Sequence, residues 1–165
     1  SVPPAITNVS GNQSVTEADN VTLNCEAAVG NPEPRITWTK VSNNSVVTFP
    51  LVISRRDQGY FRCTADNGVG NPATKDVFVT VHYPPNITYM SGNQTVNQTY
   101  FVTLNCSADG NPAPRITWTR VSDNSAVTFP LTITGKGNEG AYTCTADNGV
   151  KDSFSKDTFI ILQSK

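Results

Sequence analysis

The chain has 165 residues, and its 12 lysines and arginines nearly balance its 13 aspartates and glutamates, so the formal net charge is −1. Only Arg55 and Arg56 cluster. Nucleic acid is therefore excluded as a partner, because phosphate binding needs a basic face. No apolar run reaches the length that a membrane helix needs, so we expect no direct membrane insertion.

The sequence is a tandem repeat. Residues 30–53 (GNPEPRITWTKVSNNSVVTFPLVI) return as residues 110–133 (GNPAPRITWTRVSDNSAVTFPLTI) with only five differences. Each copy also carries a cysteine, a tryptophan and a second cysteine at matching places: Cys25, Trp38, Cys63 and Cys106, Trp118, Cys144. The repeat predicts two domains, residues 1–82 and 83–165.

Short alternations of apolar and polar residues predict strands throughout, and no sustained helical period is present. In the first copy they lie around 20–27, 36–41, 46–53, 61–65 and 76–81, and the second copy repeats them. Because successive strand side chains point to opposite faces, the cysteines and tryptophans fall on the inward side. The fold class is all-β.

Asp66-Asn67-Gly68 and its copy Asp147-Asn148-Gly149 predict a tight hairpin, since Asn-Gly tolerates two positive φ angles. Aspartate is a good turn residue in its own right, so we predict neither a metal site nor any cofactor there. His82 is the only histidine and has no second copy, which leaves histidine-based catalysis without a partner residue. We expect no enzyme activity.

The four cysteines are expected to form disulfides. A zinc site would need short C-x-x-C spacing, which is absent. The two cysteines of each copy are 38 residues apart. Cross-linking a loop of that length stabilises a domain by about 4 kcal/mol, against a total stability of roughly 5 to 10 kcal/mol for so small a domain.

Eight N-x-S/T sequons indicate an extracellular or cell-surface protein that carries N-linked glycans. Asn105 is the weakest, because Cys106 is its middle residue. The candidate glycosylation sites are Asn8, Asn12, Asn20, Asn43, Asn86, Asn93 and Asn97. We expect no signal peptide within these residues, and we expect the chain to be part of a longer ectodomain.

The order Cys, Trp, Leu-x-Ile, then a Gly and an aromatic residue before the second Cys resembles the immunoglobulin fold. GNPxPxITW and C-x-ADN-G-V are most similar to the intermediate-set domains of adhesion molecules, fibroblast growth factor receptors and hemicentin-like proteins. The resemblance covers the chain twice. It implies disulfides Cys25–Cys63 and Cys106–Cys144, with Trp38 and Trp118 in the cores.

Two departures from that family matter. Phe61 stands where the family places the tyrosine of the tyrosine corner, so the first corner lacks its hydrogen bond, whereas the second keeps Tyr142. Only 24 residues lie between Trp38 and Cys63, and 25 between Trp118 and Cys144, which is about a dozen fewer than the family usually has. We therefore expect tandem immunoglobulin-like β-sandwiches of strands A, B and E against C, F and G, each shortened between strands C and E. Residues 46–53 would form a connection plus strand E, which stays a protected edge or pairs with a neighbouring molecule.

Because prolines follow the last strand of the first domain directly, we expect a stiff junction between the domains. Apart from Asn43, the sequons are expected on the sheet of strands A, B and E or at the junction, which leaves the sheet of C, F and G free of sugar. Its outward residues are the candidate partner-binding set: Arg35, Thr37, Thr39, Arg62, Thr64, Phe78, Arg115, Thr117, Thr119, Thr143, Thr145 and Phe159. The alternative is that sequons cluster by chance and that a bulge buries Phe78 and Phe159.

Two functions remain open. One is an extracellular recognition or adhesion segment of a cell-surface receptor or adhesion protein, which binds a protein partner, homophilic binding to a second copy included. The other is a structural spacer in a multi-repeat extracellular matrix protein.

Overall fold

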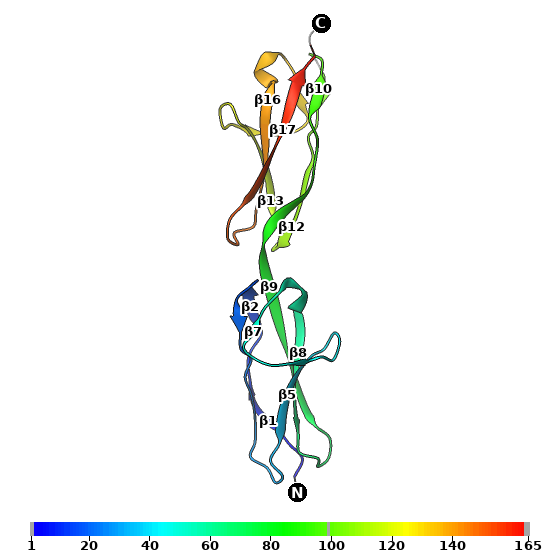
Figure 1. Ribbon diagram of the computed structural model, residues 1–165, viewed down its shortest axis with the longest axis vertical. Coiled ribbons are helices and arrows are strands. Elements are labelled where there is room, and N and C mark those ends of the chain that lie inside the picture. The colour runs from blue at the N-terminus through cyan, green and yellow to red at the C-terminus, as the bar shows by residue number, and fades with distance from the viewer. Residues whose placement is uncertain (1, 99, 164–165) are drawn as a thin grey trace. The chain divides into compact units, whose positions relative to one another are not determined.

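The computed structural model describes residues 2–98 and 100–163. Its contacts divide the chain into two units, Ser1–His82 and Tyr83–Lys165 (Figure 1). The elements of unit 1 are β1 (Ile6–Val9), β2 (Gln13–Thr16), β3 (Asn20–Val21), β4 (Cys25–Ala27), β5 (Arg35–Lys40), β6 (Val46–Val47), β7 (Leu51–Val52), the 3-10 helix η1 (Arg55–Asp57), β8 (Gly59–Asp66) and β9 (Ala73–Met90). Residues 83–90 of β9 belong to unit 2.

Unit 2 repeats this order of elements. After its part of β9 come β10 (Gln94–Val96), β11 (Phe101–Val102), β12 (Cys106–Asn111), β13 (Arg115–Arg120), β14 (Ala126–Val127), β15 (Leu131–Thr132), the 3-10 helix η2 (Lys136–Asn138), β16 (Gly140–Asp147) and β17 (Phe154–Leu162). The predicted all-β class and the two tandem immunoglobulin-like sandwiches are confirmed.

Each unit is a sandwich of two layers. The larger layer of unit 1 has the order β2-β9-β8-β5-β6, and that of unit 2 the order β10-β17-β16-β13-β14. The other layer consists of strand pairs: β1 with β4 and β3 with β7 in unit 1, β9 with β12 and β11 with β15 in unit 2. Strands C, F and G are β5, β8 and β9 in unit 1 and β13, β16 and β17 in unit 2. The expectation that strand A lies wholly in the layer of strands B and E was wrong, because β2 pairs parallel with β9, and β10 with β17, in the layer of C, F and G.

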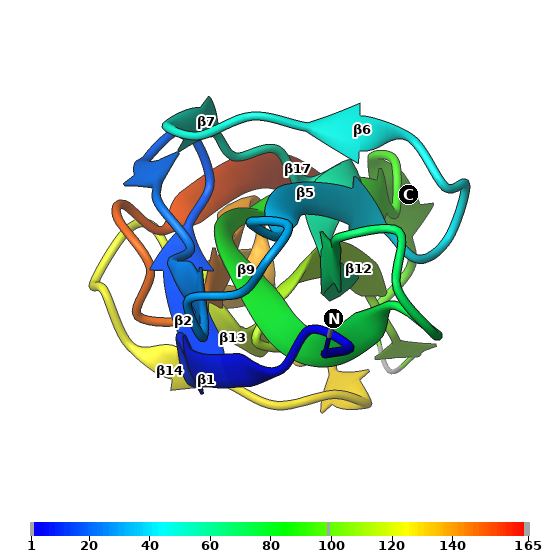
Figure 2. The ribbon, with the colours of Figure 1, turned by 90° about the horizontal axis from the view of Figure 1, so that it is seen from below.

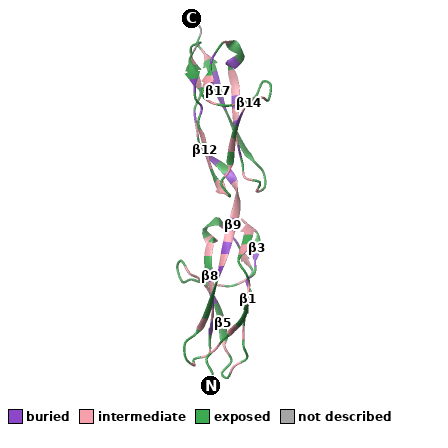
Figure 3. Cartoon of the chain, turned by 180° about the vertical axis from the view of Figure 1, so that it is seen from behind, coloured by how far each residue is buried: buried purple, intermediate pink, exposed green. Residues whose placement is uncertain are grey.

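A tryptophan packed beside the disulfide closes each core. The structure contains both predicted disulfides, Cys25–Cys63 and Cys106–Cys144. Trp38 lies directly opposite Cys63 in the β5–β8 register, and the ring of Phe49 meets Trp38 edge-on at 5.7 Å between centroids. Unit 2 repeats the contact between Trp118 and Phe129 at 5.5 Å. Figure 3 shows the buried positions inside each sandwich and the exposed ones on its loops.

The shortened segment crosses from one layer to the other as a single span. Figure 2 shows this crossing between β6 and β7. Residues 46–53 are not simply a connection plus strand E, because Val46 and Val47 pair with Thr39 and Trp38 of β5 as an added edge strand. Among the described residues β7 pairs only with β3, so no strand D is present in this layer. Phe49 lies in the crossing between β6 and β7, and its ring packs against the core on the side where strand D is absent.

The Asn-Gly turns differ from the predicted tight hairpin. Strands β8 and β9 are joined by residues 67–72, and Gly68 has positive φ whereas Asn67 does not. The side-chain amide of Asn67 instead donates to the carbonyl oxygens of Val2 (2.9 Å) and Pro32 (3.2 Å). Asp66 accepts from the N–H of Gly68, as expected of a turn residue.

Asn148 makes the same two bonds in unit 2, to Tyr83 and Pro112. A Cβ on Gly110 would lie 3.0 Å from the Asn148 amide nitrogen and 3.2 Å from the Pro85 Cα, so any larger residue there would have to displace one of these groups. The near-identity of the two repeats at these turn positions therefore has a structural cause, because the same side-chain bonds recur in both units.

The corner before strand F is fixed differently in the two units. In unit 2 the buried Tyr142 hydroxyl donates to the carbonyl oxygen of Asn138 at 2.7 Å, whereas Phe61 of unit 1 has no hydroxyl. Unit 1 has an ion pair here instead, between Lys40 and Asp57 at 2.8 Å. Burial alone would raise the pKa of Asp57. The hydrogen bonds from Lys40 and Ser54 and the charge of Lys40 outweigh burial, so that pKa lies below its usual value of 3.8.

Replacing Phe49 by Ala should destabilise unit 1 by about 3 kcal/mol, since a large aromatic ring is lost from a site where no strand D can close the gap. Phe129→Ala should do the same to unit 2. Hydrogen exchange measured peptide by peptide gives the free energy of opening for each unit. Phe49→Leu, which keeps most of the volume, should cost less. An effect no larger than that of the exposed neighbour change Thr48→Ala would contradict the role of Phe49.

The Lys40–Asp57 pair makes unit 1 sensitive to acid. A carboxylate whose pKa is lower in the folded state stabilises the fold above its unfolded pKa, and this stabilisation is lost as pH falls below about 4, through the folded pKa. Unit 2 has the uncharged Asn138 in this place. Asp57→Asn should lower the stability of unit 1 at neutral pH and reduce its loss of stability in acid. An unchanged pH profile of unfolding would rule this out.

Candidate protein-binding surface

The outward side chains of the β2-β9-β8-β5-β6 layer form rows across the strands of unit 1. We call this surface, and its equivalent in unit 2, the outer face. The rows of unit 1 are Arg35 with Asp66, then Thr37 with Thr64 and Thr74, then Thr39 with Arg62 and Asp76, and last Tyr60 with Phe78. The rows of unit 2 are Arg115 with Asp147, Thr117 with Thr145 and Ser155, Thr119 with Thr143 and Asp157, and Ala141 with Phe159.

The structure brings the predicted residues together within each unit. All six candidates of each unit lie on its outer face, and none is buried, whereas their chain neighbours Trp38, Cys63 and Val77 are. The bulge that would bury Phe78 and Phe159 is absent, because the β8–β9 and β16–β17 ladders run without a register shift. The half-buried Phe78 packs edge-on against Tyr60 at 4.9 Å, and 46% of Phe159 is exposed.

The two outer faces differ in polarity. In unit 1, Arg62 makes a bidentate ion pair with Asp76 at 2.8 and 3.1 Å. The hydrogen bond to Asp76 and its charge raise the pKa of Arg62 above its ordinary value. In unit 2 the same row is held by a hydrogen bond from Thr143 to Asp157 at 2.6 Å. This row of unit 1 therefore contains an arginine and an aspartate held by each other, while the same row of unit 2 contains only the aspartate charge.

Sequence reasoning missed several residues of this face. Tyr60, which is 55% exposed, has the same parity along strand F as Arg62 and could have been found from the alternation. Thr74 and Asp76 could have been found in the same way. Val46, 73% exposed, could not, because the two-residue pairing of β6 with β5 leaves no periodic signal.

The candidate glycosylation asparagines are all exposed. The outer face is less separate from them than expected. Asn12 and Asn93 do not lie on the opposite layer: their side-chain oxygens accept from the backbone N–H groups of Phe78 and Phe159, at 2.9 and 3.1 Å. Both asparagines therefore lie at the strand-G margin of the outer face.

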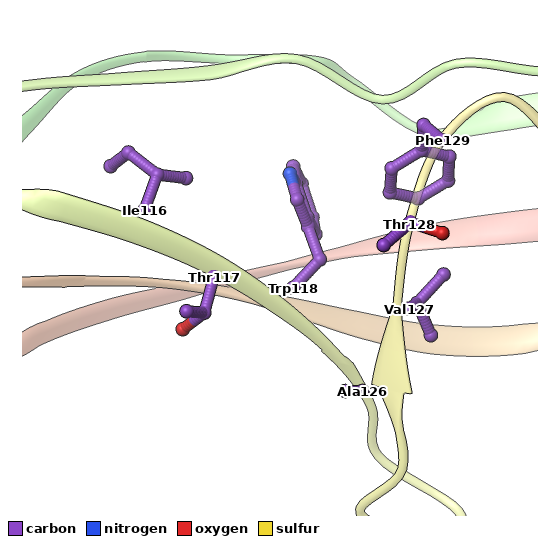
Figure 4. A pocket seen from close by; sticks show the side chains of 7 residues that line it. All are labelled: Ile116, Thr117, Trp118, Ala126, Val127, Thr128 and Phe129. Atoms are coloured by element: carbon purple, nitrogen blue, oxygen red, sulfur yellow. The ribbon is translucent and has the colours of Figure 1, made fainter.

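A hollow of about 350 Å³ opens beside the crossing of unit 2. It is lined by Ile116, Thr117, Trp118, Ala126, Val127, Thr128 and Phe129 (Figure 4). Ile116, Trp118 and Phe129 project into the space between the layers, while Thr117 points the other way. None of the lining residues has an acidic or basic side chain, and Thr117 points away, so the hollow offers no acid, base or nucleophile beyond the Thr128 hydroxyl.

Within residues 2–98 and 100–163, no group of three or more His, Cys, Asp or Glu side chains is placed to hold a metal ion. The same residues contain no helix with the length and hydropathy of a membrane span.

The family model for the immunoglobulin domain matches residues 3–67 and 84–148. The chain belongs to the immunoglobulin domain family, with one domain of it in each unit.

Curated relatives match over most of the chain. Limbic system-associated membrane protein of Rattus norvegicus is 33% identical over 96% of the chain, and the chain spans 48% of that protein. Peroxidasin homolog of Homo sapiens is 32% identical over 98% of the chain, which covers 13% of it. The chain thus spans about half or less of the length of these relatives.

Solved structures show the same fold. The DIP-gamma IG1+IG2 structure has a TM-score of 0.84 at 20% identity, with 98% of each chain covered. Titin domains I67–I69 give 0.68 at 19% identity, over 97% of this chain and 65% of theirs.

Proposed function

We propose that the chain is the recognition or adhesion segment of an extracellular protein, and that it binds a protein partner through the outer face. The observation that carries this proposal is the rows of threonine, charged and aromatic side chains, which lie on a continuous hydrogen-bonded layer in both units. Interfaces favour aromatic and arginine side chains and need polar groups that are already oriented.

The aromatic and charged rows of unit 1 are suited to such contact. The exposed Tyr60 is braced by Phe78, and Arg62 is held by Asp76, so both lose little side-chain freedom when a partner binds. The edge strand β6 adds the exposed Val46 beside Thr39. Unit 2 has Thr143 in the place of Arg62 and Ala141 in the place of Tyr60, which gives its outer face a different specificity.

Relatives and neighbours support a protein partner. One relative is named a membrane protein. In one solved structure, DIP-gamma IG+IG2 is bound to Dpr11 IG1, with a TM-score of 0.76 at 20% identity over 98% of this chain. A second copy of the chain is one candidate partner, since homophilic binding needs only self-complementary faces. The matched segment of peroxidasin is too small a share of that protein to imply catalysis by this chain.

The structural-spacer alternative is favoured by one observation, the near-identity of the repeats. A spacer needs no binding face. The two functions therefore differ in what happens when the outer face is blocked.

Blocking the outer face with a new sugar should abolish binding. Arg35→Asn creates the sequon Asn-Ile-Thr on β5, and Arg115→Asn creates the same sequon on β13. The control Glu26→Asn with Ala28→Thr places a sequon on the opposite layer. Secreted, glycosylated protein is tested for self-association by sedimentation across a concentration range, and for binding to an array of cell-surface and secreted ectodomains.

We expect self-association or binding to at least one ectodomain. The affinity should fall on the order of tenfold or more in an outer-face variant whose added glycan is confirmed by mass, and stay unchanged in the control. Absence of any binding would favour the spacer. Binding that survives both outer-face glycans would assign recognition to another surface.

A further inference from the structure

One sequon is kept at the same place in both repeats. Residues 10–15 read SGNQSV and residues 91–96 read SGNQTV, so the single difference exchanges serine for threonine and preserves N-x-S/T. None of the other sequons has a counterpart: for example, Tyr89 replaces Asn8, Phe101 replaces Asn20 and Asp123 replaces Asn43.

The two asparagines of this pair make the same backbone hydrogen bond, and Asn93 Oδ1 also accepts from the Thr158 hydroxyl at 3.5 Å. The side-chain oxygen of Asn12 accepts from the N–H of Phe78, and that of Asn93 accepts from the N–H of Phe159. Both residues are exposed, and in the described part of the chain neither Nδ2 donates a hydrogen bond. The amide oxygen therefore faces the strand and leaves the nitrogen available.

The hydrogen bonds explain why asparagine stands at positions 12 and 93, but they do not explain why a serine or threonine follows two residues later. An asparagine oxygen caps the strand-G N–H, so packing alone would retain Asn12 and Asn93. Ser14 and Thr95 are exposed, and neither hydroxyl has a hydrogen-bond partner among the described residues. The hydroxyl is the group that an N-glycosylation acceptor needs at this position.

We propose that Asn12 and Asn93 carry N-linked glycans, which mark the strand-G margin of the outer face in both units. In the transfer, Nδ2 attacks C1 of the terminal N-acetylglucosamine of a lipid-diphosphate oligosaccharide. The new C1–N bond replaces the C1–O bond, the lipid diphosphate leaves with the bonding electron pair, and one amide proton passes to a base. The product keeps Oδ1, so the strand-G hydrogen bond and the glycan coexist.

This placement limits how a partner approaches. The hydrogen bond fixes the plane of the amide, so the first sugar starts from a set direction beside strand G. A partner then has access to the side of the outer face formed by β5, β6 and β8 in unit 1, and by β13, β14 and β16 in unit 2. The limit on a partner's approach rests on the proposed function, whereas the presence of the two glycans does not, because a glycan can be detected without a partner.

The test uses the whole chain, secreted from mammalian cells behind an added signal peptide. Glycopeptide mass spectrometry measures occupancy at each sequon. Ser14→Ala and Thr95→Ala remove the acceptor motif but leave the asparagine hydrogen bonds, while Ser14→Thr and Thr95→Ser keep the motif. Hydroxyl-radical footprinting compares the oxidation of Phe159 in the wild-type protein and in Thr95→Ala.

We expect glycan on most copies of Asn12 and Asn93, its loss in both alanine variants and its retention in the Ser/Thr exchanges. Oxidation of Phe159 should be slower in the wild-type protein than in Thr95→Ala. Unmodified Asn12 and Asn93 would overturn the proposal, whether or not other sequons carry sugar. Occupied sites with equal oxidation of Phe159 would overturn the placement beside strand G.

Discussion

The contact of one tryptophan with one disulfide is the constraint on which each unit depends. Trp38 lies opposite Cys63 in the register, and the bond from Cys63 to Cys25 ties the two layers together at that point. Because strand side chains alternate, fixing Cys63 inward also fixes Arg62 and Thr64 outward. The register that builds the core therefore also builds the outer face, and unit 2 repeats it around Trp118 and Cys144.

The core stays closed despite the shortened crossing because an aromatic ring packs where strand D would otherwise cover it. Phe49 packs edge-on against Trp38 and at a tilt against Phe61, 6.3 Å between centroids, so the open side of the core is filled by one side chain. The corner below it is held by the Lys40–Asp57 ion pair in one unit and by the Tyr142 hydroxyl in the other. Arg120 lies over the Tyr142 ring in the place of Lys40. An ion pair in unit 1 and a hydroxyl hydrogen bond in unit 2 thus hold the same corner of the backbone.

The sequence predicts whatever depends on alternation and on matching spacings. These signals predicted the all-β class, the two domains and the outward rows around Thr37 and Thr64, while the resemblance to immunoglobulin domains implied the sandwiches, the disulfide pairing and the buried tryptophans. They failed where a short or non-local pairing decides the structure. The two-residue β6, the parallel pairing of β2 with β9 and the bonds of Asn67 to Val2 and Pro32 leave no periodic trace. For the same reason Asn12 was assigned to the wrong layer.

The central claim is that each core closes on its own around its tryptophan and disulfide, and so holds its outer face. Calorimetry of the double variant Cys25→Ala, Cys63→Ala tests this most directly. The account predicts that unit 1 loses about 4 kcal/mol of stability, the model-dependent cost of the lost cross-link, while unit 2 unfolds at its unchanged temperature. A single transition in which both units lose stability together would contradict it.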